Sequence, residues 1–420
     1  MPTGKVSPAI NARVVPVVSV STTLPAWAAA ISPGRWEAAS TNTFMSVDSN
    51  LAGADFDEIM RNYNGAAAVP AGSTAYPTGA MLFWGGGHSD QGFDSSVVAL
   101  DLGTRLYTRI EGPGVGPFTN GPVGTYPNGV FADGVPVPTH TYCYPAFDPV
   151  SESFVIPRGG SAYGQDYNTR VSRIGVCHVY NLAASAWRVG PPNRSNDTFY
   201  AAGGWSVWDT RRNCIWTRPC NSSISPTVLV KYEGLGSASG GIYGTLTNYS
   251  YADSGYNEAD AAFVPGAAGD GSEDLIVYTK FEGTTKILRA VPFNGANVPQ
   301  SRITLTMGGT PPGVLRKDGA LMWSARRNSL IYYDSFQPVL SGWPALSGPA
   351  LVYELRAPTN RVTGTWTWNL LTDQAGTTFP QVDTGTGGFY SKARIIKYDD
   401  GEIMVAAVRP FDPAYAFRIP

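Results

Sequence analysis

The chain has 420 residues, with 48 Gly, 33 Pro, 12% aromatic residues, only 15% charged residues and a net charge of −2. This composition excludes long helices, because each interior Gly or Pro costs roughly 1–3 kcal/mol in a helix. It also excludes disorder, which requires low hydrophobicity and high net charge. The near-neutral charge argues against a nucleic-acid partner. We therefore expect an all-β protein with a large core.

Residues 1–32 are predicted to form an extended N-terminal arm, rich in Val, Ala, Pro, Ser and Thr. Met1–Ile10 lacks a basic region followed by an apolar run, so we expect no signal peptide. No apolar stretch is long enough to predict membrane insertion. The arm could pack on its own domain, but addition to a sheet edge of another chain is the favoured interpretation. The residues expected to dock on the partner are Val14, Val15, Val17, Val18, Val20, Leu24 and Trp27.

Two short elements are predicted after the arm. Residues 34–38 have the composition of a single strand. Residues 55–63 are the one helix expected, and Asn64-Gly65 would end it, as Gly often does just beyond a helix.

A repeated pattern runs through the rest of the chain, in which an apolar strand ends, a polar turn follows and a second apolar strand begins. Trp208–Ile215 is echoed closely by Trp323–Leu330, and Phe147–Phe154 has the same form. The six copies begin at Ala66, Phe147, Trp208, Phe263, Trp323 and Ile396. Two more strands follow in each complete copy, for example Val97–Leu102 and Leu106–Ile110. Four strands in about 60 residues, repeated about six times, are typical of a β-propeller.

The last copy contains three strand signals and ends at Tyr415–Ile419. Its missing fourth strand is predicted to be Gly34–Ala38, because an N-terminal strand added to the C-terminal blade removes the edges that an open ring would leave. We therefore predict one domain over residues 33–420, a single propeller of six four-stranded blades.

Motifs in the first half resemble those of a known family. Met81–Asp90, followed by Val97–Leu102, resembles a kelch repeat, in which a Gly pair closes the second strand. Together with Pro33–Trp36 and His140–Tyr142, this pattern is similar to kelch-like propeller proteins of tailed bacteriophages and prophages. Arg158–Gly160 keeps the Gly pair in the second blade, but later blades lack it at that position.

The same motifs supply a candidate site. The second-to-third loop and the connection between blades open on one face of a propeller, so His88, Asp90, His140 and Tyr142 could gather on one rim. Two imidazoles and a carboxylate could bind a metal. The favoured interpretation is structural, with hydrogen bonds that join blade one to blade two. We therefore expect no metal, no cofactor and no catalytic residue.

Several other reactive side chains are assigned to the core. Cys143, Cys177, Cys214 and Cys220 are expected to be mainly buried free thiols, although a bridge between the last two is open. His178 lies within an apolar strand and is expected to be a core histidine.

The resemblance implies a non-enzymatic virion protein of a tailed bacteriophage, in the tail, neck or fibre region. The propeller would be a rigid adaptor or host-facing binding module, present in multiple copies in a symmetric assembly. Its partners would be other virion proteins, reached through the arm, and a host surface glycan is a further candidate. We expect the protein to be assembled in the host cytoplasm.

The alternative is a carbohydrate-binding or carbohydrate-active propeller of the galactose-oxidase-like group, and a bacterial kelch-type scaffold is a third reading. In the carbohydrate-binding alternative, the residues that could stack on a sugar ring are Tyr163, Trp205, Trp343 and Tyr390, although packing between blades is the favoured role of each.

Overall fold

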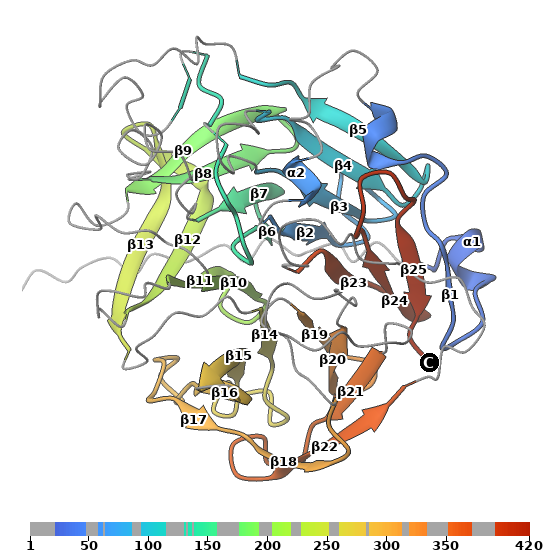
Figure 1. Ribbon diagram of the computed structural model, residues 1–420. Helices are drawn as coiled ribbons and strands as arrows, with labels where there is room; N and C mark the ends of the chain where they lie inside the picture. Colours follow the sequence, from blue (N-terminus) through green and yellow to red (C-terminus); the bar gives the residue numbers. More distant parts are fainter. Residues whose placement is uncertain are drawn as a thin grey trace, which may run out of the picture.

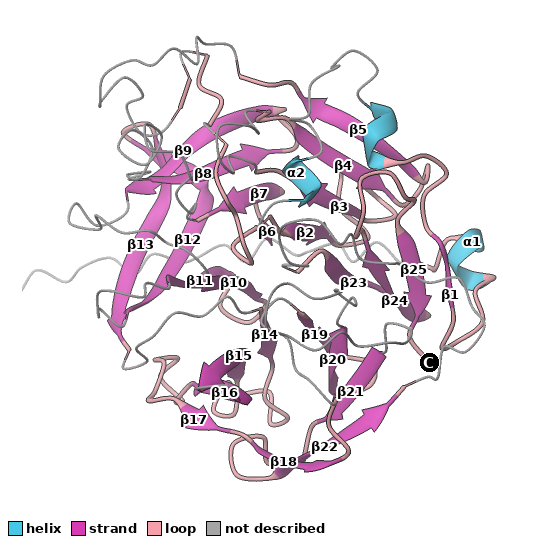
Figure 2. Ribbon diagram, viewed as in Figure 1, coloured by secondary structure: helices cyan, strands magenta, loops and turns pink. Residues whose placement is uncertain are grey.

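A computed structural model gives the architecture of the chain (Figure 1). It describes residues 22–47, 58–61, 64–85, 94–114, 130–131, 133–136, 138–157, 176–192, 204–219, 228–251, 260–282, 285–312, 319–333, 352–371 and 391–420. Six sheets stand around a central axis, and strands dominate the described chain (Figure 2). The predicted six-bladed, all-β propeller is confirmed.

The first three blades each contain four antiparallel strands, from the axis outwards. Blade 1 consists of β2 (Ala66–Val69), β3 (Ala80–Phe83), β4 (Val97–Asp101) and β5 (Leu106–Glu111). Blade 2 consists of β6 (Ala146–Asp148), β7 (Ser153–Ile156), β8 (Val176–Asn181) and β9 (Ala186–Pro192). Blade 3 consists of β10 (Gly204–Asp209), β11 (Cys214–Pro219), β12 (Val228–Ser239) and β13 (Ile242–Ser250).

The last three blades repeat this order with two variations. Blade 4 consists of β14 (Ala261–Val264), β15 (Leu275–Glu282), β16 (Thr285–Pro292) and β17 (Ile303–Thr304). Blade 5 consists of β19 (Ala320–Ser324), β20 (Ser329–Tyr333), β21 (Val352–Arg356) and β22 (Thr365–Leu370), and β18 (Thr306–Gly309) adds a fifth, parallel strand to the outer edge. Blade 6 consists of β23 (Ala393–Tyr398), β24 (Gly401–Ala406), β25 (Tyr415–Arg418) and the distant β1 (Trp36–Ala38).

The ring closes through β1, which pairs antiparallel with β25 and places Trp36 opposite Phe417. The rings of Trp36 and Phe417 lie 5.3 Å apart, and Trp36 also packs 5.2 Å from Tyr333 of blade 5. Trp36 is buried. The predicted closure by an N-terminal strand is therefore confirmed, and it buries a large apolar surface between the last two blades.

Turn chemistry explains the sharp first hairpins of blades 3 and 5. Asn213 and Asn328 hold the same place in the two repeats, directly before the second strand, with φ of 48° and 53°. Asn tolerates this left-handed region better than most residues, because its short side chain can hydrogen-bond locally. The repeat seen in the sequence is therefore a repeat of backbone geometry.

The helices are short. α2 (Glu58–Arg61) lies inside the helix predicted for residues 55–63, α1 (Ala26–Ala29) was not predicted, and Phe44–Val47 forms one turn of 3-10 helix. No helix in the described ranges is long and apolar enough to cross a membrane.

Residues 22–31, the end of the predicted arm, form a strap that packs on the protein's own blades 1 and 6. Thr22 and Asp399 exchange two 2.8 Å hydrogen bonds, and the Leu24 amide donates to Asp400 Oδ1 at 2.8 Å. The Trp27 indole donates to the Leu102 carbonyl at 2.9 Å.

The strap corrects part of the sequence-based interpretation. Leu24 is 93% buried in the core shared by blades 1 and 6, since its exposed fraction is 7%. Trp27 is half-buried against the same core, below the Arg105 guanidinium at 5.1 Å. Leu24 is therefore held within the molecule, whereas Trp27 keeps part of its surface exposed. Val14, Val15, Val17, Val18 and Val20 lie outside the described residues.

Candidate ligand site in the central channel

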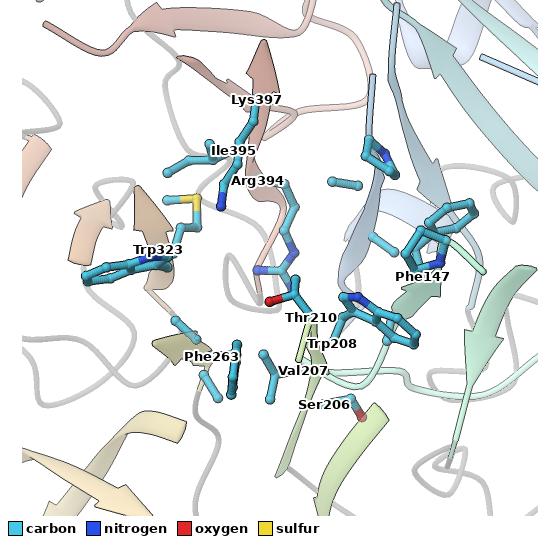
Figure 3. A pocket seen from close by; sticks show the side chains of 18 of the residues that line it. Phe147, Ser206, Val207, Trp208, Thr210, Phe263, Trp323, Arg394, Ile395 and Lys397 are labelled. Carbon is cyan, nitrogen blue, oxygen red and sulfur yellow. The ribbon is translucent and has the colours of Figure 1, made fainter. Parts of the chain in front are cut away.

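The centre of the ring holds a cavity of about 450 Å³, walled by all six innermost strands (Figure 3). Each innermost strand contacts those of both neighbouring blades, so the six form a closed wall. The cavity reaches the first residues beyond these strands, including Pro149, Thr210 and Ala325. It therefore extends towards the face that carries the first hairpin turn of every blade. We call this cavity the funnel.

The hairpin registers place one residue of each blade in the same layer of the funnel wall. The last paired residues of the innermost strands are Val69, Asp148, Asp209, Val264, Ser324 and Tyr398. The residues directly before them, all of which line the funnel, are Ala68, Phe147, Trp208, Phe263, Trp323 and Lys397. Blades 2 to 5 thus supply four aromatic rings, whereas blade 1 supplies a small side chain and blade 6 a cation.

The aromatic side chains serve both the funnel and the packing between blades. Phe147 and Phe263 are each 5% exposed and Trp323 is 8% exposed, so a small part of each ring faces the cavity. Trp208 is more accessible. Together with Met322, they make the wall largely apolar and rigid.

A buried ion pair forms the deep end of the funnel. Arg394 Nη1 lies 2.8 Å from Asp260 Oδ2, and Arg394 Nε donates to the Ala66 carbonyl at 3.0 Å. Asp260 is fully buried and also accepts the Leu321 amide at 2.9 Å. Both charged residues stand four positions before the last paired residue of their strand, so they lie in one layer. This pair connects blades 1, 4, 5 and 6 across the axis.

Lys397 is the second cation of the funnel. Its side chain is accessible to the cavity, and Figure 3 shows it entering the cavity from the same strand as Arg394. The surrounding protein lowers the pKa of its amino group, while the negative charge of Glu402 opposes this shift. Glu402 is buried and already accepts hydrogen bonds from Ser324 Oγ and, at 3.4 Å, from the Arg326 amide. Glu402 therefore acts on Lys397 through its charge, while its described hydrogen bonds go to other groups.

The charge of the funnel follows from these contacts. Arg394 and Lys397 are the charged side chains that line it among the described residues, and Asp260 compensates the first. Glu402 lies near Lys397 but makes no hydrogen bond to it among the described contacts. A lysine side chain without a direct partner, in an apolar, ring-walled cavity, favours an anionic ligand with an apolar or ring-shaped body.

The site expected from the sequence lies on the opposite face. His140 and Tyr142 precede β6, are buried, and contact each other through His140 Nδ1 and Tyr142 Oη at 3.3 Å. Between them, Thr141 accepts the Gly65 amide at 3.1 Å and donates its own amide to Asn64 Oδ1 at 3.0 Å. These bonds, which Thr141 makes and not the residues predicted from the sequence, join the starts of blades 1 and 2. His88 and Asp90 lie outside the described residues, so their gathering with this pair stays a prediction.

Other predicted groups are in the core. Cys177 and Cys214 are buried free thiols, and burial raises the pKa of both; Cys143 is buried as well. His178 is also buried, and desolvation lowers its pKa to about 3, so the ring is neutral at ordinary pH. Trp205 is fully buried against Tyr278, with ring centroids 5.4 Å apart.

Cys220, Tyr163, Trp343 and Tyr390 lie outside the described residues. In the part of the chain that the structure describes, no three His, Cys, Asp or Glu side chains gather in a way that could hold a metal ion.

The funnel was not predicted, although the sequence carried a signal for it. The repeat begins with an aromatic residue in four blades, and these four residues line one layer of the wall. In blade 6 the repeat was aligned on Ile396, but Lys397 holds the equivalent position. Its hairpin turn contains two residues, Asp399 and Asp400, whereas the turns of blades 2, 3 and 5 contain four. Because this turn is shorter, a comparison of the six repeats by sequence places blade 6 one residue out of step. A displacement of one residue exchanges the two faces of a strand, so Lys397 was not matched with the aromatic residues.

Comparison with known proteins gives distant likenesses. No family model matches the chain, and no curated protein matches its sequence. Among solved structures, it is similar to an α-L-arabinanase of Penicillium chrysogenum, with a TM-score of 0.42, 10% identity and coverage of 85% of this chain and 92% of that one.

Two further solved structures are similar to a comparable degree. A PQQ-bound aldose sugar dehydrogenase of Streptomyces coelicolor has a TM-score of 0.38, 10% identity and coverage of 92% and 98%. A member of the DUF4221 family from Bacteroides vulgatus has a TM-score of 0.41, 8% identity and coverage of 92% and 99%. Likenesses of this size say nothing about the activity of this chain.

Proposed function

We propose that this chain is a non-enzymatic structural protein of a tailed-bacteriophage virion, in the tail, neck or fibre region. Its propeller would be a rigid adaptor or a host-facing binding module. The resemblance of Pro33–Trp36, Met81–Asp90 and His140–Tyr142 to kelch-like phage propellers supports this assignment.

The strap supports the proposal that the N-terminal segment anchors the propeller to another protein. Residues 22–31 are fixed on blades 1 and 6, with hydrogen bonds from Thr22 and Leu24 to the turn between β23 and β24. The Val-rich segment Val14–Val20 directly precedes this fixed point in the sequence. If this segment docks on another chain, the strap would hold the propeller in a fixed position next to that chain.

The length of the segment permits docking at a distance. The 21 residues before the strap could span about 70 Å when extended, since each residue adds ~3.3–3.6 Å. This reach would allow a partner to be bound without covering either face of the propeller.

Co-sedimentation tests this function. A lysate of cells that produce the protein naturally is separated on a density gradient, and fractions are probed with an antibody against the propeller. We expect the protein to migrate with tailed particles, and a variant lacking residues 1–21 to remain at the top as a folded monomer. Full-length protein found entirely at the top, in fractions free of particles, would overturn the virion assignment.

A further inference from the structure

The proposed virion function, which rests on the strap and the N-terminal segment, gives no role to the funnel. We propose that it binds a carboxylated sugar, a uronic acid of one or two residues, with the carboxylate held by Lys397. This inference rests on the proposed binding role of the propeller, but not on its place in a virion.

The size of the funnel fits such a ligand. Its volume of about 450 Å³ falls within the ~300–1,000 Å³ of cavities that hold small molecules.

The walls favour a ring-shaped body. Trp208, Phe263 and Trp323 come from three successive blades and line the same layer, so apolar C–H groups of a sugar ring could pack against them. Thr210 adds an accessible hydroxyl at the level where the funnel meets the turns. This combination of apolar rings with a few polar groups is typical of small-molecule sites.

The charges favour a carboxylate on that ring. The charge of Arg394 is neutralised by Asp260 at 2.8 Å, and Arg394 already donates to the Ala66 carbonyl. Its main role is therefore to close the deep end of the cavity. Lys397 is an exposed residue of the funnel wall, and the nearby carboxylate of Glu402 accepts its described hydrogen bonds from Ser324 and Arg326. Glu402 acts on Lys397 through its charge, and a bound carboxylate would add the direct hydrogen-bonded ion pair that the described residues do not provide.

The asymmetry of the wall fixes the direction of binding. The layer that holds Lys397 in blade 6 holds Ala68 in the adjacent blade 1 and Phe263 in blade 4. The carboxylate would therefore lie on the side of blades 6 and 1, where there is space. The sugar ring would lie on the side of blades 3 to 5, against the aromatic residues.

Calorimetric titration of the full-length protein tests this site. Galacturonic acid and its dimer are the probes, galactose is the neutral match, and benzoate is a carboxylate on an aromatic ring. We expect the acidic sugars to bind at least about tenfold more tightly than galactose, as the loss of a charge-assisted hydrogen bond implies. The affinity should fall as salt is added.

Three variants complete the test. Lys397→Met should weaken acidic-sugar binding about tenfold or more while the Tm is unchanged, because the side chain is accessible. Lys397→Arg keeps the charge and should retain most of the affinity. Lys231→Met, which removes a lysine of blade 3 paired with Glu233, is the matched control and should bind as the wild type does.

Each contrary result overturns the site. Equal binding of galactose and galacturonic acid, full affinity of Lys397→Met, binding of benzoate without the sugars, or no binding of any probe would each do so. Absence of binding by a protein that still co-sediments with particles would remove the funnel proposal and leave the virion proposal intact. Binding of the acidic sugars by a protein that does not co-sediment with particles would support the funnel proposal and overturn the virion proposal.

Discussion

Arg394 and Asp260 show how single residues shape the centre of the ring. Removing Arg394 would leave the fully buried Asp260 without its cation. We expect Arg394→Met to lower the free energy of unfolding by about 3–5 kcal/mol, the range found when one partner of a buried pair is lost. Chemical denaturation measures this change. The double variant Arg394→Met/Asp260→Asn should recover part of it, whereas equal losses in the single and double variants would show that charge plays no part.

His178 gives the protein a sensitivity to acid. Its pKa is lowered to about 3 by burial, against ~6.5 in an unfolded chain. Between these values the unfolded state binds a proton that the folded state does not, so stability falls as pH falls through this window. We expect His178→Phe to lose less stability than the wild type from pH 6.5 to pH 4, by up to ~1.4 kcal/mol per pH unit. Parallel stability curves for the two proteins would contradict this prediction.

At the scale of elements, the strap behaves as part of the core. Leu24 packs so closely on β24 that a Cβ at Gly401 would lie 2.5 Å from Leu24 Cδ1. We expect Leu24→Ala to lower the free energy of unfolding by about 2–4 kcal/mol, as large-to-small core substitutions do. Denaturant melts measure the change, with Val150→Ala as a control because Val150 is 70% exposed. A loss no larger than that of the control would show that the strap adds no stability.

The elements also show what sequence patterns can establish. The strand repeat predicted the blades because alternation and turns are local properties that each blade repeats. The fifth strand of blade 5 was missed because β18 pairs with β22 across more than 50 residues, and the two pair in parallel. The funnel was missed for a related reason, since Asp260 and Arg394 meet only when six strands close a ring. Nothing near either residue in the sequence indicates the other.

At the scale of the whole molecule, closure by β1 makes the ring depend on both ends of the described chain. We expect a variant lacking residues 1–21 to keep the Tm of the full chain, because it retains the strap and β1, which close the ring. A variant lacking residues 1–38 loses the strap and β1, and exposes the rings of Phe417 and Tyr333. Its Tm should fall by more than 10 °C or its cooperative transition should disappear, as calorimetry would show. Equal Tm values for the two deletions would contradict this view of closure.

The distance in sequence between β1 and β25 has a consequence for biosynthesis. Trp36 leaves the ribosome long before Phe417 is made, and at ~5–20 residues per second the delay is roughly 20–75 s. During this time Trp36 has no strand to pair with, and the aromatic faces of the growing blades are open to solvent. The nascent chain should therefore depend on chaperones until its last strand emerges. A message truncated before residue 415 would yield a chain that cannot close, and quality-control proteases would remove it.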